Sequence, residues 1–220
     1  MRVLGLDPSL TNYGWAIHDT DAEGRDRCPE RGRFQTSSKT VFVDRYIDLR
    51  AAVRDLVQRV QPDRCGVEFP VFHELYSEGM YGLFLYTCEA LKGEGQDVVF
   101  WSNGQIKAHA RESLGRPAGW KMGKMDMVAA AKADAGGGRW NHNEADAYLA
   151  GRLAARFWLL YQDDLLEREL TPTERKYFLA IHRHVRGRKA GRVTKSGALY
   201  REDERFFLWS GGCDAEGKEG

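Results

Sequence analysis

The chain of 220 residues has little cysteine, little proline and no long hydrophobic run. Its four cysteines are scattered, without a Cys-x-x-Cys pair, which argues against a zinc site and against a disulfide framework. No run approaches the roughly 18 apolar residues that span a bilayer, and the first residues enter a strand-like run rather than a secretory signal. We therefore expect a reduced, cytoplasmic protein with no membrane partner. The glycine run at 136–138 lacks a following Gly-Lys-Ser/Thr, so we also expect no small-molecule cofactor.

What the chain does contain is a globular composition with one strongly basic segment. Apolar residues make up 42% and aromatic residues 11%, which suits one packed domain with an appendage. The net charge is only +1, yet residues 171–200 hold eight Lys or Arg and a single acid. Such a segment indicates a polyanionic partner, and its His and Tyr residues favour nucleic acid; the alternative is a solvated tail. The candidate contacts are Arg183, Arg186, Arg188, Lys189, Arg192 and Lys195.

Hydrophobic periodicity predicts an α/β protein. The first three strands should be antiparallel and the later ones parallel, in a mixed central sheet with helices on both faces. We expect this domain to cover 1–165. Residues 166–220 would form a basic C-terminal extension with a possible helix and hairpin and frayed last residues. The expected strands are 2–7, 13–18, 34–43, 64–69 and 97–101. The expected helices are 46–60, 74–91, 105–114, 124–135 and 142–161, and residues 21–33 should form a loop or a wide hairpin turn.

Three acids stand at the ends of apolar elements. Asp7 ends one strand-like run and Glu68 ends another, while Asp146 lies in an alanine-rich helical stretch. If the two strands are parallel neighbours, about 5 Å apart, their carboxylates lie at the same edge of the sheet. A helix packed across that edge would supply Asp146. Buried carboxylates need a positive partner, and oxygen ligands suit a hard cation such as Mg²⁺ or Mn²⁺.

Each acid alone also has a structural explanation. Asp7 precedes Pro-Ser and is typical of a turn, Glu68 would suit a salt bridge to an arginine, and Asp146 would suit a helix surface. Asn141 and Glu144 fit a helix capping box, which gives Glu144 a structural role. Spacing alone leaves these alternatives open.

The motifs around the acids resemble those of RuvC-type Holliday junction resolvases. The opening run from Val3 to Ile17, with Asp-Pro-Ser and Thr-x-x-Gly, is similar to the start of that family, and the segments around Glu68, Lys107, Lys124 and Asp146 are similar to its later motifs. The resemblance covers about 1–155. The length and basic C-terminus are more similar to phage-encoded members.

The resemblance implies an RNase H-like fold, a homodimer, and resolution of four-way junctions and related branched double-stranded DNA by paired, metal-dependent nicks. It implies that Asp7, Glu68 and Asp146 hold two Mg²⁺ ions, with Mn²⁺ able to replace them. Lys107 and Lys124 would contact the phosphate near the scissile bond. The chain departs from the family where an acid or His is expected three residues before the last Asp. Asn143 stands there as a neutral oxygen ligand, and the adjacent His142 is the alternative.

Other segments are candidates for DNA or dimer contacts. Phe72, His73 and Tyr76 follow the Glu68 strand and would stack on unpaired bases, or pack as an ordinary loop. Cations interleave with an aromatic residue at Arg116, Trp120 and Lys121. The apolar helix at 74–91 would be a core helix or, as the resemblance implies, a dimer interface.

Two further functions compete with a nuclease. One is a catalytically weak or silent protein that binds branched DNA through the basic tail, which the neutral Asn143 mildly favours. The other is an actin/Hsp70-like ATPase, whose fold also opens on an Asp-bearing strand. That fold needs a second phosphate-binding hairpin and two large lobes, and the short chain shows neither.

Overall fold

The fold is described from a computed structural model that covers residues 1–20, 25–69, 77–161, 167–186, 197–202 and 206–211. Side chains from residue 180 onward lie outside the description. The strands are β1 (Arg2–Asp7), β2 (Asn12–Thr20), β3 (Asp26–Arg27), β4 (Arg31–Gln35), β5 (Arg64–Phe69), β6 (Val98–Ser102), β7 (Gly197–Glu202) and β8 (Phe206–Gly211). The helices are α1 (Phe42–Val60), α2 (Ser77–Gly93), α3 (Asn103–Ser113), α4 (Lys124–Ala135), α5 (His142–Tyr161) and α6 (Pro172–Arg186), with a short 3₁₀ turn at Glu167–Glu169.

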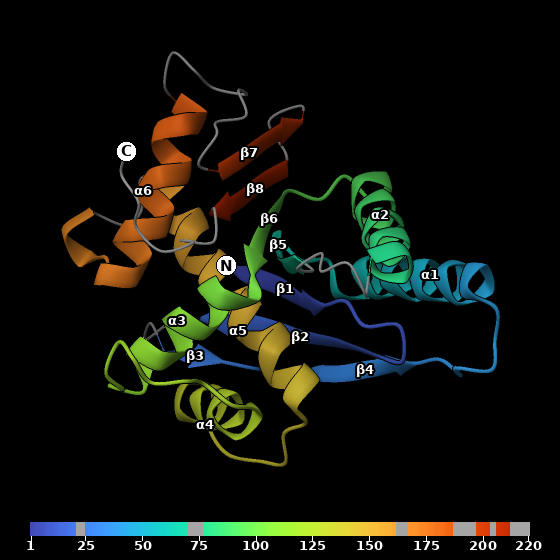
Figure 1. The fold of residues 1–220 in the computed structure, drawn as a ribbon, viewed down its shortest axis with the longest axis horizontal. Helices are drawn as coiled ribbons and strands as arrows, with labels where there is room; N and C mark the ends of the chain where they lie inside the picture. Colours follow the sequence, from blue (N-terminus) through green and yellow to red (C-terminus); the bar gives the residue numbers. More distant parts are fainter. Residues whose placement is uncertain (21–24, 70–76, 162–166, 187–196, 203–205, 212–220) are drawn as a thin grey trace.

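One mixed sheet organises the molecule, with strand order β3-β2-β1-β5-β6-β8-β7 and β4 paired to β2 (Figure 1). β1, β2 and β4 are antiparallel neighbours, whereas β1, β5 and β6 run parallel. The predicted α/β class, with antiparallel strands first and parallel ones later, is confirmed. β7 and β8 pair as a hairpin in the C-terminal extension, and β8 lies parallel to β6.

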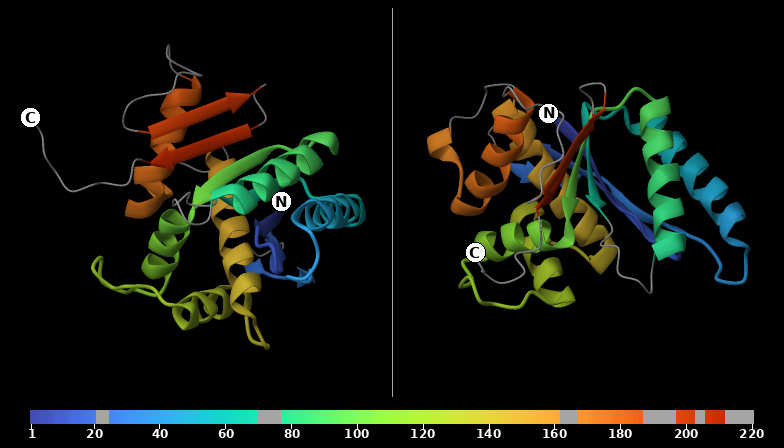
Figure 2. Two further views of the ribbon diagram at one scale, coloured as in Figure 1. Left: turned by 45° about the vertical axis from the view of Figure 1, so that its right-hand side comes forward. Right: turned by 45° about the horizontal axis from the view of Figure 1, so that its top comes forward.

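Helices cover both faces of the sheet, and Figure 2 shows the two layers from other sides. Along β1 the side chains alternate: Leu4 and Leu6 pack with α1 and α2, while Val3 packs with the layer that contains α3, α4, α5 and α6. This period of two assigns each strand residue to one face. α5 is the central helix of the second layer, because it contacts β1, β2 and β5. No helix within the described ranges is long and apolar enough to cross a membrane.

The predicted strand at 34–43 is wrong in its second half. β4 ends at Gln35, and α1 begins at Phe42. Phe42 and Val43 instead form the exposed first turn of α1, and Val41 is its N-cap residue. Conversely, β4 begins at Arg31, inside the expected loop, because pairing with β2 outweighs its polar composition. The charged side chains of β4 suit an edge strand.

The start of α3 was also predicted too late. The helix begins at Asn103 because Ser102 and Gln105 form a capping box, in which each side chain binds the backbone N–H of the other. The predicted bounds of α4 and α5 are confirmed. The first residues of the predicted helix at 74–91 lie outside the described residues, and α2 is described from Ser77.

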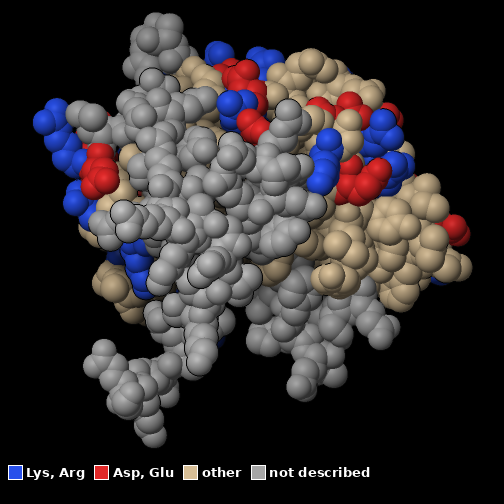
Figure 3. All heavy atoms as spheres, turned by 90° about the horizontal axis from the view of Figure 1, so that it is seen from above, with Lys and Arg blue, Asp and Glu red and all other residues tan. Residues whose placement is uncertain are grey.

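Charges of opposite sign alternate on the side of the molecule shown in Figure 3, where Lys and Arg lie beside Asp and Glu. Several ion pairs link the helices and strands, for example Arg54 with Glu94 at 2.8 Å and Arg64 with Asp97 at 3.3 Å. Solvent-exposed pairs of this kind contribute little to stability, because water and salt screen them.

Candidate active site

The C-terminal ends of β1 and β5 bring two acids to neighbouring positions. The parallel register pairs Leu6 with Val67, so Asp7 and Glu68 are the next residues along each strand. Gly5 and Gly66 face α5. Asp7 and Glu68 lie two residues further along their strands, so their side chains project to the same face, toward α5. Neighbouring strands lie about 5 Å apart. The two carboxylates consequently occupy one edge of the sheet and one of its faces.

Helix α5 approaches this face closely because glycines line its path. A Cβ atom added to Gly5 would lie 1.9 Å from the carbonyl oxygen of Ala147, and one added to Gly66 would lie 2.4 Å from the Cβ of Ala154. Real side chains never tolerate such distances, so the backbones of helix and strands meet only where glycine stands. Asp146 precedes Ala147 and is therefore held over the strand ends.

The three carboxylates affect one another electrostatically. Burial, and then the charges of Glu68 and Asp146, hold the pKa of Asp7 well above its usual range. Burial and the charge of Asp146 raise the pKa of Glu68 to about 7. Burial likewise raises the pKa of Asp146 to about 6. Like charges in a shared, poorly solvated site repel one another and disfavour ionisation of the carboxyls. A bound cation would offset this repulsion and favour the ionised form.

Two lysines face the acids from other helices. Lys107 of α3 acts against the raised pKa of both Glu68 and Asp146, and Lys124, the first residue of α4, does so for Asp146. The strand ends and the first turns of α3, α4 and α5 thus meet at one edge. Helix N-termini carry partial positive charge and favour anions. This edge of the molecule combines an acidic centre with a positive surround.

Asn103 is a contributor that sequence reasoning missed. Its side-chain amide donates a 2.7 Å hydrogen bond to Oε1 of Glu68 and lowers the pKa of that carboxyl. The signal was available, because Asn103 directly follows β6, the next parallel strand, and residues there reach the same edge.

The first turn of α5 is fixed by its cap. The backbone N–H of Asn141 donates to Glu144, and the side chain of Asn141 accepts from the backbone N–H of Asn143. The side-chain amide of the buried Asn143 donates to the carbonyl of Asn12. Its side-chain carbonyl oxygen accepts a hydrogen bond from His142 and is the atom of this amide that can bind a cation. His142, one turn before Asp146, has its Nε2 3.5 Å from Nζ of Lys124.

The donor set suits a hard divalent cation, although its present arrangement is open. Among the described residues, no three Asp, Glu, His or Cys side chains are close enough to hold a metal ion. Oδ1 of Asp146 is nevertheless buried without a hydrogen-bond partner. Three oxygen donors that repel one another, one with an orphaned atom, match the ligand chemistry of Mg²⁺ or Mn²⁺.

The other predicted contact residues are only partly described. Arg116 lies over the ring of Trp120, 4.8 Å from its centroid, in the exposed loop that leads to α4, and Lys121 is exposed beside them. Residues outside the described ranges are Phe72, His73, Tyr76, Arg188, Lys189, Arg192 and Lys195; the backbones of Arg183 and Arg186 lie in α6.

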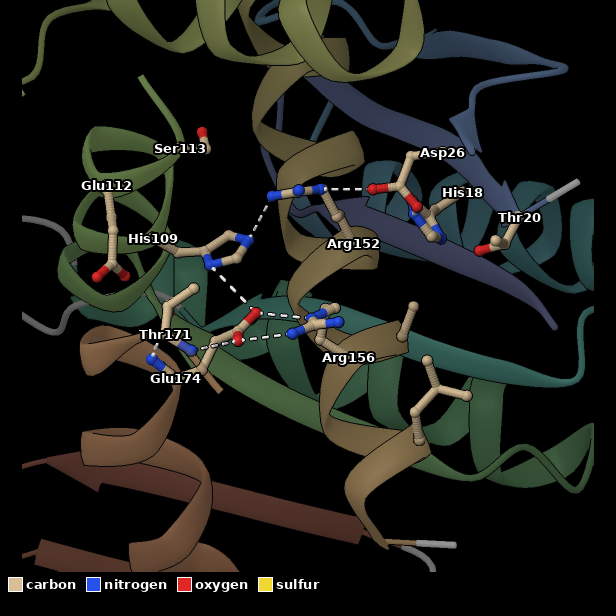
Figure 4. Close-up of a pocket in the computed structure, with 12 residues that line it drawn as sticks. His18, Thr20, Asp26, His109, Glu112, Ser113, Arg152, Arg156, Thr171 and Glu174 are labelled. Carbon is tan, nitrogen blue, oxygen red and sulfur yellow. Dashed lines mark hydrogen bonds and ion pairs between the residues drawn. The ribbon is translucent and has the colours of Figure 1, made fainter. Parts of the chain in front are cut away.

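A pocket of about 410 Å³ lies away from the acids, between α3, α5, α6 and the β2–β3 region (Figure 4). A chain of ion pairs and hydrogen bonds runs along it. Arg152 binds Asp26 at 3.0 Å and His109 at 2.8 Å, and Arg156 binds Glu174 at 2.9 and 3.0 Å. The network fastens the first turn of α6 to α5. Its members are distant in sequence, so no local pattern predicts them.

The described residues have the RNase H-like fold of RuvC. The structure of Thermus thermophilus RuvC matches with a TM-score of 0.60 and 17% identity, covering 74% of this chain and 97% of that one. RuvC of the same organism in complex with Holliday junction substrate gives a TM-score of 0.58 and 16% identity, over 74% and 96%. Identities this low establish the fold alone.

Sequence similarity points to the same proteins. Crossover junction endodeoxyribonuclease RuvC of Finegoldia magna is 35% identical over 74 residues, which are 34% of this chain and 44% of the relative. The RuvC of Clavibacter michiganensis is 29% identical over 111 residues, 49% and 54% of the two chains. The chain thus spans about half the length of these curated relatives, which are named as enzymes. No protein-family model matches the chain.

Proposed function

We propose that this protein is a divalent-metal-dependent endonuclease that resolves four-way junctions and related branched DNA. The observation that carries the proposal is the group Asp7, Glu68 and Asp146 at a single sheet edge, where burial raises the pKa of all three carboxyls and the charge of Asp146 adds to the rise for Asp7 and Glu68. The relatives named as crossover junction endodeoxyribonucleases support the reaction class. The RuvC structure with Holliday junction substrate supports the choice of DNA.

The residues of this chain have distinct roles in the proposed reaction. Asp7, Glu68 and Asp146 hold two Mg²⁺ ions, which Mn²⁺ can replace; such a pair supplies activation of the attacking water and stabilisation of the leaving 3′ oxygen. Lys107 and Lys124 bind the phosphate and offset its developing charge. Asn103 orients Glu68 through its 2.7 Å hydrogen bond. Arg116, Trp120 and Lys121 contact the DNA arm beside α4, and the basic extension adds phosphate contacts.

Asn143 completes the metal site through its carbonyl oxygen. Its amide nitrogen is held by Asn12, which turns the amide in a fixed direction. His142 lies on the helix face of Asp146, one turn earlier, and close to Lys124. It is the alternative ligand. Assignment of the chain to the phage-encoded members depends on its length and basic C-terminus only.

A labelled synthetic four-way junction tests the function. With Mg²⁺ or Mn²⁺ we expect paired, near-symmetric nicks across the junction, which disappear with EDTA. An ATPase would hydrolyse ATP and leave the DNA intact. Binding of the junction without nicks in either metal would instead identify a silent branched-DNA-binding protein, a function that the neutral Asn143 favours.

Replacing Asn103 tests the support of Glu68. In Asn103→Ala the carboxylate loses its hydrogen bond, so its pKa rises further above about 7. Loss of such a partner behind a metal ligand typically costs about 10–100-fold in metal affinity or activity. We expect the Mg²⁺ concentration for half-maximal nicking to rise within that range, and the pH profile to move upward. An unchanged Mg²⁺ requirement would mean that Asn103 does not act on the site.

The proposed homodimer would use an exposed apolar patch on α1 and α2. Large apolar side chains are exposed on these two helices and at the residue before α1, namely Val41, Phe42, Val43, Ile47, Tyr81 and Leu85. Exposed apolar patches commonly mark protein–protein contacts. A twofold enzyme would suit a junction of near-twofold symmetry.

A charge placed in this patch should separate the dimer. We expect Leu85→Glu to sediment as a monomer at micromolar concentration, where the wild-type protein sediments as a dimer. Met125→Glu is the matched control, since Met125 is exposed on α4 outside the patch. If Leu85→Glu sediments like the wild-type protein, the patch is not the interface.

A further inference from the structure

Arg45 is a buried cation without an acidic partner. It lies in the first turns of α1 and is only 5% exposed. Its Nε donates to the hydroxyl of Thr36 at 2.9 Å, its Nη2 lies 3.4 Å from the hydroxyl of Thr11, and its guanidinium carbon lies 5.7 Å from the centre of the Phe42 ring. Among the described residues no carboxylate pairs with it. Burying a guanidinium without an anion costs folding free energy, because the two hydroxyls replace part of its hydration but do not neutralise its charge.

Two half-buried arginines of α5 are neutralised. Arg156 is paired twice with the buried Glu174, and Arg152 is paired with Asp26 and Asp134. These carboxylates keep the pocket of Figure 4 electrically balanced, so it calls for no ligand. Arg45 differs because the neutralising anion is not part of the described chain. Two of the five N–H groups of its guanidinium account for its bonds to Thr36 and Thr11.

The position of Arg45 indicates which anion would fit. Thr11 lies four residues after Asp7, in the connection from β1 to β2, so the two are at most about 14 Å apart along the chain. Thr36 follows β4 and donates to the carbonyl of Leu10 in the same connection. Thr11 is exposed, as is the hydroxyl- and lysine-bearing stretch 37–40. Nucleotides rise about 3.4 Å each along a DNA strand, so a strand cut at Asp7 passes Thr11 within about four nucleotides.

We propose that Arg45, with the hydroxyls of Thr11 and Thr36, binds a phosphate of the DNA strand that flanks the cleaved bond. This phosphate-binding cluster lies on the α1 side of the sheet, whereas Lys107 and Lys124 lie on the α5 side. A DNA strand that contacts both the α1 side and the α5 side would be fixed on either side of the three acids. The inference rests on the proposed DNA substrate, but not on its cleavage.

The test compares Arg45→Met with the wild-type protein in EDTA, so that no cleavage occurs. Met keeps an unbranched apolar stem and removes the charge. Binding of a fluorescent four-way junction is measured between 50 and 200 mM salt, at a temperature where circular dichroism shows each protein folded. Loss of one phosphate contact lowers the slope of log affinity against log salt by about 0.9. We expect that loss, with affinity about tenfold weaker. Arg54→Met, on the same helix and paired with Glu94, should keep the wild-type slope.

Stability provides a second readout. Removing a buried, unpaired charge should leave the Tm of the DNA-free protein unchanged or raised, because the charge serves the ligand rather than the fold. A wild-type salt slope in folded Arg45→Met would overturn the inference, as would a wild-type protein that does not bind the junction. Absence of nicking by the wild-type protein with Mg²⁺ and Mn²⁺ would overturn the nuclease proposal alone, since binding is measured without metal.

Discussion

Asp146→Asn should abolish junction nicking and at the same time make the metal-free protein more stable. Loss of one transition-state-stabilising group commonly costs 10²–10³-fold in rate, and we expect at least about a hundredfold loss here. The gain in stability follows from the raised pKa values of Asp7 and Glu68, part of which is caused by the charge of Asp146. One pKa unit corresponds to about 1.4 kcal/mol, and 1 kcal/mol moves Tm by about 2–4 °C in a chain of this size. Each pKa unit that the charge of Asp146 contributes therefore corresponds to about 3–6 °C, and we expect Tm to rise.

The same acids make the stability of the metal-free protein depend on pH. Their pKa values are higher in the folded chain than the ordinary values of 3.8 and 4.5, reaching about 6 for Asp146 and about 7 for Glu68. At pH values between the ordinary pKa and the raised pKa of each acid, the folded state binds more protons than the unfolded state. Stability should therefore fall as pH rises from about 4 to about 7, and saturating Mg²⁺ should restore it.

Thermal unfolding across pH, with and without Mg²⁺, measures these effects. Asp146→Asn should show a smaller fall with pH and little gain from Mg²⁺. Asp55→Asn is the matched control, because Asp55 is exposed on α1, and it should behave as the wild-type protein. If Asp146→Asn nicks junctions at the wild-type rate, or lowers the metal-free Tm, the acids do not form a shared charged centre.

Gly5→Ala should be the most destabilising conservative change in the described part of the chain. The added Cβ would lie 1.9 Å from the carbonyl oxygen of Ala147 and 2.8 Å from the amide nitrogen of Gly151. Both are backbone atoms, so no side chain can rotate away, and helix α5 must move from the sheet. Overpacking costs typically 1–3 kcal/mol and occasionally more; we expect about 3 kcal/mol or more, or about 6–12 °C in Tm.

The displacement should also weaken metal binding, since Ala147 follows Asp146 directly. Gly5→Ala should therefore lose part of the Mg²⁺-induced rise in Tm that the wild-type protein shows. Gly93→Ala is the control, because nothing lies within 4 Å of an added Cβ there. A Gly5→Ala protein with wild-type Tm would show that α5 does not depend on this close approach.

Local patterns in the sequence predicted much of the fold. Apolar runs that end in an acid, such as β1 and β5, marked strands buried on both faces, and the capping residues before α5 marked its start. The failure at β4 has a physical cause, since Arg31 and Arg33 are polar residues whose strand exists through pairing with β2. The β propensity of a segment does not include the stabilisation that it gains from pairing with a strand elsewhere in the chain.

The candidate site was predictable in its acids but not in its supports. Asp7 and Glu68 follow from strand ends, whereas the glycines that admit α5 look in the sequence like weak strand formers. Asn103 required knowledge that β6 is the next parallel strand. Arg45 required knowledge of burial, since an arginine in a helix is ordinarily solvated.

Diffraction at the manganese absorption edge from crystals grown with Mn²⁺ tests the central claim most directly. We predict anomalous density between Asp7, Glu68 and Asp146, with carboxylate oxygens of all three within about 2.0–2.3 Å of a metal ion. Mn²⁺ bound elsewhere, with the three carboxylates still apart, would contradict the claim that they form one metal centre.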